Sequence, residues 1–245
     1  MDDATEVEAD TGEIPYEPHI GATRQYWRDI VLGVNDGIVS IFLLVAGVVG
    51  GGLDPRQVFL TAVAGAVAGA VSMASGEFLA TKSQDEVLDA ELRLERIHIR
   101  HHRDKELAQL REMFAAMGIE GEDLDTVVSI FDKSDRALLE AMKALEFGAV
   151  DSERRSPFKA MAFSGLLFLV GSLPPALPFA LAVDVNTGLL WASILTAVAL
   201  VGVGVAKTRV TRGNPLVAGL ENLAIAGLGG VVAYLIGSAV GAGPV

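Results

Sequence analysis

Long apolar runs alternate with charged segments along this chain, and five of the runs are long enough to cross a bilayer. The hydrocarbon core of a membrane takes about 20 consecutive apolar residues of helix. Windows of that length with few charges fall at residues 30–50, 58–80, 158–181, 187–206 and 216–240. The pattern therefore predicts an all-α membrane protein with five transmembrane helices.

The second apolar run continues without a Pro or Gly break after Gly76 into a charged segment, TKSQDEVLDAELRLERIHIRHHRDKELAQLREMF. We predict one unbroken helix over residues 58–117 that leaves the membrane. At 100° per residue, six side chains with oxygen or nitrogen donors share an arc of about 80° on this helix. They are Glu91, Glu95, His98, His102, Glu106 and Gln109. This stripe is a candidate metal-binding surface, and the alternative is an ordinary solvated helix face.

Residues 82–156 are predicted to form a compact, cytoplasmic, three-helix insert between transmembrane helices two and three. The long helix is expected to end at Gly118, and a short helix should follow around residues 123–131. Ser134 is a suitable cap for a third helix, which stops at Gly148 and carries Met142 and Glu146 one turn apart. Leucines of this third helix are expected to cover an apolar strip on the long helix.

Four segments of the chain follow from these predictions. An acidic tail, expected to be disordered, covers residues 1–22, and transmembrane helices one and two cover residues 23–81. The insert covers residues 82–156 and is predicted to bind metal. Transmembrane helices three to five cover residues 157–245, and Pro174, Pro175 and Pro178 are expected to break or kink the third.

The distribution of basic residues predicts the orientation in the membrane. The chain has 31 acidic and 19 basic residues, and every base but Arg56 lies on the side of the N-terminal tail and the insert. The positive-inside rule assigns that side to the cytoplasm and the C-terminus to the outside. Since the bases are interleaved with acids, a nucleic-acid partner is not expected. The N-terminus lacks the basic region of a cleaved signal, which favours a prokaryotic cell membrane.

Polar residues inside the first two apolar runs are candidates for an ion path. The chain has no cysteine, so a metal must be bound by oxygen, imidazole or thioether groups, and no prosthetic group is expected. An ionised Asp at the centre of a bilayer costs about 2.5–3.5 kcal/mol, so Asp36 in the first run marks an ion or proton path. The alternative is that Asn-Asp-Gly caps or kinks a broken helix. Met73 and Glu77, one turn apart in the second run, are expected at a similar depth. An oxygen, thioether and oxygen set suits a borderline transition metal better than Mg²⁺ or Ca²⁺.

Two stretches in these runs carry a family resemblance. RDIVLGVNDGIVS, followed at the right interval by AGAVSMASGEFLATKSQDE, resembles the vacuolar iron transporter family. The resemblance implies five spans with a cytoplasmic metal-binding insert, and export of Fe²⁺, in some members Mn²⁺, from the cytosol. It also implies proton exchange and a homodimeric pore. On this resemblance Asp36 and Met73 line the translocation path, and Glu77 is the Glu of the SMASGE motif.

The resemblance also implies a ligand set in the insert, with four Glu on the long helix and a Met and a Glu on the last helix. In this chain the positions are occupied by Glu95, His98, Glu106, Gln109, Met142 and Glu146. His98 and Gln109 stand where Glu is expected, which removes two carboxylates from the set. Imidazole still binds Fe²⁺, Mn²⁺ and Zn²⁺, and Glu91 and His102 on the same stripe are available to compensate.

Three functions are compatible with these residues. The favoured one is a secondary transporter that exports Fe²⁺ or Mn²⁺ in exchange for protons, with metal, protons, lipid and a second copy of the chain as partners. A membrane-anchored metal-binding or sensing protein is the alternative, although five spans exceed what an anchor requires. A ferritin-like oxidase needs Glu-x-x-His pairs from two helices, and the insert has one pair, Glu95 with His98. We therefore do not expect an enzyme.

Overall fold

The computed structural model describes residues 24–148, 154–182, 184–211 and 213–241, and within these ranges the chain is all-helical with no strand. The helices in order are α1 (Arg24–Gly50), α2 (Pro55–His101), α3 (Arg103–Ala116), α4 (Gly121–Asp132), α5 (Asp135–Leu145), α6 (Pro157–Leu181), α7 (Val185–Thr211) and α8 (Pro215–Gly241). Five of these, α1, α2, α6, α7 and α8, are long and apolar enough to cross a membrane. The predicted all-α fold with five spans is confirmed. The expected acidic tail lies outside the described residues.

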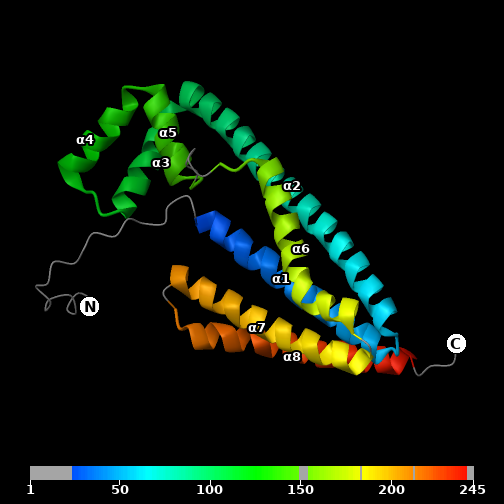
Figure 1. Ribbon diagram of the computed structural model, residues 1–245. Helices are drawn as coiled ribbons and strands as arrows, with labels where there is room; N and C mark the ends of the chain where they lie inside the picture. The colour runs from blue at the N-terminus through cyan, green and yellow to red at the C-terminus, as the bar shows by residue number, and fades with distance from the viewer. Residues whose placement is uncertain (1–23, 149–153, 183, 212, 242–245) are drawn as a thin grey trace, which may run out of the picture.

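Helix α1 is the centre of the bundle, because it packs against each of the other four long helices (Figure 1). Glycines bring the helices into close contact. A Cβ added to Gly37 would lie 2.2 Å from the carbonyl oxygen of Phe168, and one added to Gly171 would lie 2.2 Å from that of Val34. Helices α1 and α6 therefore cross backbone to backbone next to Asp36, which fixes the position of that residue.

The face that α2 turns to the bundle is built from small residues at a spacing of four. Val58 and Ala62 are fully buried, and Ala66 and Ala70 nearly so. The glycines of the GxxxG pattern on this helix are used within the chain, since Gly65 lies against Leu44 of α1 and Gly69 against Phe168 of α6. Their role is packing inside one subunit.

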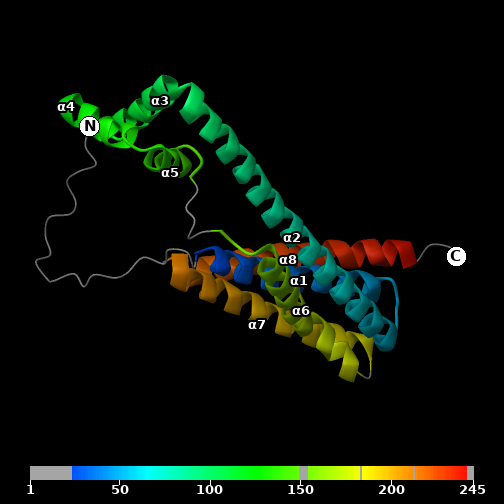
Figure 2. The ribbon, with the colours of Figure 1, turned by 90° about the horizontal axis from the view of Figure 1, so that it is seen from above.

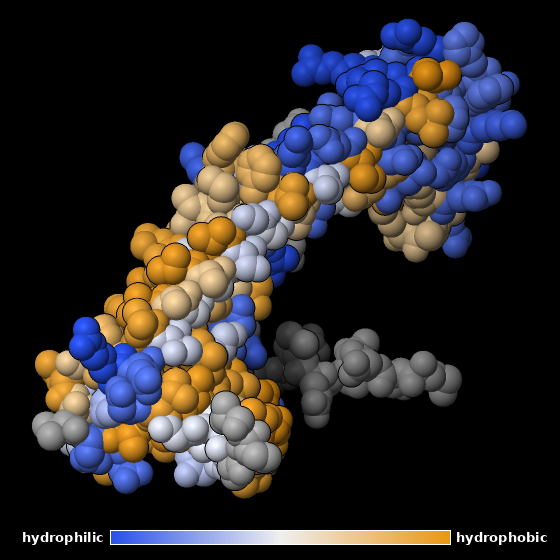
Figure 3. Space-filling model, turned by 90° about the vertical axis from the view of Figure 1, so that its right-hand side faces the viewer, coloured by the Kyte–Doolittle hydropathy of each residue, from blue (hydrophilic) through white to orange (hydrophobic). Residues whose placement is uncertain are grey.

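Helix α2 has 47 residues, so it is about 70 Å long and extends well beyond the bundle. Figure 2 shows its second half carrying α3, α4 and α5 away from the other long helices. In Figure 3 apolar residues cover the bundle and hydrophilic residues cover the far end of the molecule. The apolar and charged parts of the sequence are thus separated in space.

The prediction of one helix over residues 58–117 is wrong, because the helix breaks at His102. The backbone of His102 leaves the helical region, with φ −137° and ψ 34°, and its carbonyl accepts a hydrogen bond from the N–H of Lys105 at 2.8 Å. Helix α3 then turns away from the axis of α2 (Figure 1). The turn lets Ile99 and Leu110 enter one apolar cluster with Leu138 and Met142. No Pro or Gly stands at the break. We therefore attribute the break to the burial of these apolar side chains.

The other helices of the insert agree with the predictions. The helix before Gly118 ends there, with Gly118 at φ +88°, and α4 covers the expected short helix. The hydroxyl of Ser134 accepts a hydrogen bond from the N–H of Ala137 and caps α5 as predicted. Leu138 of α5 is fully buried against Leu110 of α3, so the third helix covers the apolar strip.

Two spans that carry residues typical of a helix break are continuous. Helix α6 continues through Pro174, Pro175 and Pro178, so the third span is not broken. Helix α1 likewise runs without a break through Asn35, Asp36 and Gly37. The alternative that Asn-Asp-Gly caps a broken helix therefore does not apply.

Candidate functional site

The turn at His102 brings together three side chains that the sequence analysis selected as metal ligands. Carboxylate oxygens of Glu95 and Glu106 and a ring nitrogen of His98 all lie within 4.8 Å of one another. His98 Nδ1 is 3.3 Å from Glu106 Oε1. Glu106 reaches the cluster because α3 folds back on α2. The prediction had instead placed Glu106 beside the other two residues on one straight helix. This cluster, Glu95, His98 and Glu106, is called the insert cluster below.

The two carboxylates of the insert cluster are buried. Glu95 is 4% exposed and Glu106 is 5% exposed. Oε1 of Glu95 and Oε2 of Glu106 have no hydrogen-bond partner among the described residues. Burial, and next the negative charges of Glu106 and Glu146, raise the pKa of Glu95 to about 7. A buried pair of carboxylates with orphaned oxygens favours either a proton or a metal cation.

The three further predicted ligands differ in their burial. Met142 is fully buried and packs with Ile99 and Leu138. Glu146 is exposed, but its charge is close enough to contribute to the raised pKa of Glu95. Gln109 is partly buried one turn after Glu106 on α3. Of these three, Glu146 is the one whose charge acts on a residue of the insert cluster.

The two remaining stripe residues lie apart from the insert cluster. Glu91 is exposed and lines a separate cavity of about 410 Å³ with Val87 and Phe147. His102 is exposed at the helix break, and its ring centre lies 6.1 Å from that of His98. Glu91, Glu95 and His98 keep their helical spacing on α2, whereas the break at His102 takes Glu106 and Gln109 out of that register.

Asp36 is the carboxylate placed deepest in the spans. It is partly buried, and its Oδ1 accepts a hydrogen bond from the hydroxyl of Ser40 at 2.9 Å. Among the described residues no basic side chain forms an ion pair with it. Helices α1 and α2 are antiparallel, with Leu44 against Gly65 and Arg28 against Glu77. This register places Met73 within about one helical turn of Asp36 along the helix axes.

Glu77 is engaged in ion pairs at the end of the bundle nearest the insert. Its Oε1 lies 3.3 Å from Arg155 Nη1 and 3.4 Å from Arg28 Nη2. Arg155 also forms a bidentate ion pair with Asp29, which is 3% exposed. Glu77 therefore lies nearer the insert than Asp36, at the level of Arg28 and Asp29.

Sequence reasoning missed Asp29 and Arg155. They are 126 residues apart, so spacing alone did not link them, although each directly borders an apolar run. Two polar atoms that have no hydrogen-bond partner in the described part of the chain, Oδ1 of Asn35 and Oγ of Ser164, were also missed. The carbonyl of Ser164 lies near Gly33 of α1, while the next residue, Gly165, lies against Ala70 of α2. Ser164 therefore lies at a helix contact close to the level of Met73.

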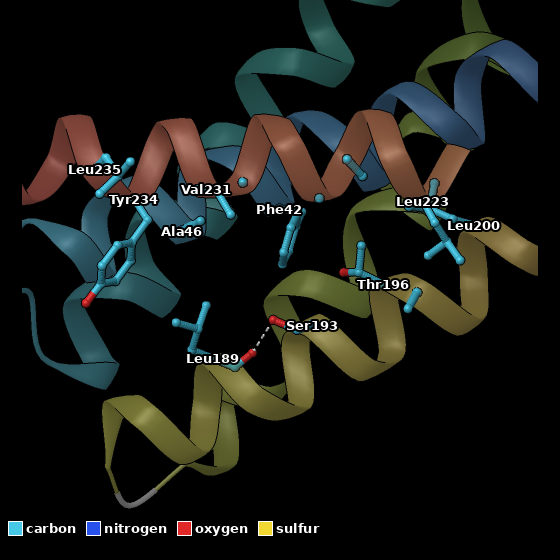
Figure 4. Close-up of a pocket in the computed structure, with 14 residues that line it drawn as sticks. Phe42, Ala46, Leu189, Ser193, Thr196, Leu200, Leu223, Val231, Tyr234 and Leu235 are labelled. Carbon is cyan, nitrogen blue, oxygen red and sulfur yellow. Dashed lines mark hydrogen bonds between the residues drawn. The ribbon is translucent and has the colours of Figure 1, made fainter. Parts of the chain in front are cut away.

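A cavity of about 400 Å³ between α1, α7 and α8 is a different kind of feature (Figure 4). Its lining is almost entirely apolar, and the hydroxyl of Ser193 is bonded to the carbonyl of Leu189 at 2.8 Å. No carboxylate, imidazole or thioether lines it. The cavity lacks the ligands that a divalent transition metal requires, so it is not a candidate metal site.

Similar sequences occur among known proteins. The sequence profile described as the VIT family matches residues 27–238. The chain is 31% identical over 224 residues to vacuolar iron transporter 1 of Tulipa gesneriana, covering 91% of this chain and 90% of that protein. It is 30% identical to vacuolar iron transporter 2 of Oryza sativa, with 87% of each chain covered. A vacuolar iron transporter of Toxoplasma gondii is 27% identical and matches 91% of this chain and 76% of its own length.

Proposed function

The chain belongs to the VIT family, and on that premise we propose that it is a secondary transporter that carries Fe²⁺ or Mn²⁺ out of the cytosol in exchange for protons. The family consists of transporters, and the chain is accordingly not an enzyme. The proposed path collects metal at the insert cluster and passes it along Glu77, Met73 and Asp36.

The observation that carries this proposal is the environment of Asp36. A carboxylate within an apolar span is costly unless its charge is compensated, and Ser40 offers it only a neutral hydroxyl. A cation that moves through the site supplies the missing charge. Met73 within about one turn adds a soft ligand, which favours Fe²⁺ or Mn²⁺ over Mg²⁺ and Ca²⁺.

Proton exchange is supported by the carboxylates of the insert cluster and of the proposed path through the spans. A carboxylate binds either a proton or a metal ion, so metal release and protonation are coupled at each site. The raised pKa of Glu95, about 7, lets that side chain change its protonation state near neutral pH. Met142, Glu146 and Gln109 are proposed to complete the metal site around the insert cluster, which also accepts Zn²⁺.

The orientation and the assembly are proposed on two further features. The bases favour a cytoplasmic insert and N-terminus and an external C-terminus. The relatives named above come from eukaryotes, and a cell membrane or an internal membrane would both fit the proposed direction of transport. A homodimer is supported by an outward face of α2 with small residues at a spacing of four, namely Ala64, Ala68, Ser72 and Gly76.

The second candidate is a membrane-anchored metal-binding protein in which the spans serve only as an anchor. The insert cluster favours metal binding in this case as well, and a flux measurement distinguishes the two functions. Purified protein in liposomes is loaded with Mn²⁺ on the side of the insert under an imposed pH gradient. A transporter moves the ion across the bilayer, whereas an anchored binding protein retains it on one side.

Variants of Asp36 test the path. Asp36→Asn keeps an oxygen that accepts the Ser40 hydrogen bond but removes the charge, so we expect flux to fall to the level of empty liposomes. Ser40→Ala removes the hydrogen bond and keeps the charge, so we expect flux to persist. Wild-type flux in Asp36→Asn would end the proposal.

A further inference from the structure

Arg155 lies between two carboxylates at the end of the bundle nearest the insert. It precedes the first residue of α6 by two positions, in the segment that returns from the insert to the membrane. Its Nη1 and Nη2 bind both carboxylate oxygens of Asp29 on α1, and Nη1 lies 3.3 Å from Oε1 of Glu77 on α2. One guanidinium therefore joins three helices of the bundle.

The group is largely shielded from water. The side chain of Asp29 is 2% exposed, that of Arg155 is 13% exposed and that of Glu77 is 19% exposed. Carboxylates so placed need a compensating cation, because an unpaired buried charge is strongly destabilising. The planar fork of Arg155 supplies it here with several hydrogen bonds.

Among the four described side chains of this group, the charges balance. Asp29 and Glu77 carry two negative charges, and Arg155 and Arg28 carry two positive ones. Arg28 is the outer partner, with a side chain that is 62% exposed and 3.4 Å from each carboxylate. A divalent ion that binds Glu77 would repel both guanidiniums, and the inner one occupies the position between the carboxylates.

We propose that Arg155 is a positioning residue that stands in for the transported cation. In the metal-free protein it holds Asp29 and Glu77 in place, and an incoming divalent ion must displace it before the ion binds Glu77. This inference rests on the proposed transport function. It makes Arg155 a competitor of the metal at the step between the insert and the spans.

The neighbouring residue provides a matched control. Arg154 forms an ion pair with Asp89 at 2.7 Å. Asp89 lies 12 residues beyond Glu77 on α2, or about 18 Å along the helix. Arg154 thus carries the same charge in the same segment, yet it binds a carboxylate outside the proposed path.

The test is the dependence of the initial rate of Mn²⁺ transport on Mn²⁺ concentration in proteoliposomes. Loss of the competing guanidinium in Arg155→Gln should lower the apparent KM about fivefold or more, the range typical of coupled binding. Arg155→Lys keeps a charge but loses the bidentate contact, so its KM should fall between those of Arg155→Gln and wild type. Arg154→Gln should leave KM unchanged.

A merely structural role for Arg155 would lower the amount of folded protein or the maximal rate without lowering KM. An unchanged or raised KM in the folded Arg155 variants overturns the inference, and so does an equal fall in Arg154→Gln. If Arg155→Gln does not fold, the comparison of Arg155→Lys with wild type decides in the same way. Absence of flux in the wild type would instead contradict the proposed function itself.

Discussion

Single side chains decide where a cation is favoured in this protein. Among the described residues Asp36 has a hydroxyl as its side-chain partner, whereas Glu77 and Asp29 are neutralised by arginines. The carboxylates therefore differ in charge compensation although they belong to the same pair of helices. A carboxylate without a basic partner favours transient binding of a cation. A carboxylate paired with arginine binds a cation after the arginine is displaced.

The raised pKa of Glu95 gives a prediction for stability against pH. Its ordinary value of 4.5 applies in the unfolded chain and about 7 in the folded one. Between these values the folded state binds more protons, so the free energy of unfolding falls as pH rises. With chelator present, we expect the melting temperature of the purified protein to be lower at pH 7.5 than at pH 5.5.

Two controls accompany this melting experiment. Glu95→Gln cannot titrate, so its melting temperature should depend less on pH over the same range. Mn²⁺ at pH 7.5 should restore the stability of the wild type, because the cation replaces the proton between the carboxylates. A wild-type melting temperature that rises from pH 5.5 to 7.5 would show that Glu95 is not held protonated.

At the scale of single residues, the sequence predicted some contacts between side chains and missed others. Glu95, His98 and Glu106 were selected by helical spacing and do lie together. Asp29 and Arg155 border apolar runs far apart in the chain, and only the packing of α6 against α1 and α2 brings them into contact. Contacts of that kind depend on tertiary packing, which local patterns do not encode.

Among the helices, α2 determines the shape of the molecule. Its first half packs in the bundle through small residues and its second half carries the insert. Length and hydropathy predicted the five spans, since the requirement for apolar residues in a bilayer is strong. The break at His102 has no Pro or Gly to signal it, because it arises from burial of Ile99 and Leu110. The prolines of α6 do not break it, because a helix inside a bundle tolerates them.

The link between helix packing and the metal site can be tested at Leu110. This residue is fully buried and lies one turn after Glu106 on α3. Leu110→Ala should lower the free energy of unfolding of the insert by about 2–5 kcal/mol and weaken Mn²⁺ binding, since a cavity there loosens α3. Differential scanning calorimetry and equilibrium Mn²⁺ binding measure the two effects.

Ile130→Ala is the matched control for this substitution. Ile130 is 54% exposed on α4, so its truncation should change stability and Mn²⁺ binding little. If Leu110→Ala behaved like Ile130→Ala in both measurements, the packing of α3 on α2 would not be what positions Glu106.

Across the whole molecule, the two proposed metal-binding regions lie along one helix. Glu95 is 18 residues beyond Glu77 on α2, or about 27 Å along its axis. The segment that returns from the insert ends at Arg155, beside Glu77 and Asp29. We therefore interpret the insert as the part that collects metal and the spans as its path through the membrane. The guanidinium of Arg155 lies between the two.

The central claim is that the insert cluster collects metal while Asp36 carries it across the membrane, and the dependence of flux on metal concentration tests this most directly. In proteoliposomes, the double variant Glu95→Gln, Glu106→Gln should lose flux at low Mn²⁺ but approach the wild-type rate at saturation. Asp36→Asn should show no flux at any concentration. Flux through Asp36→Asn at saturating Mn²⁺, or a double variant inactive at every concentration, would contradict this division of roles.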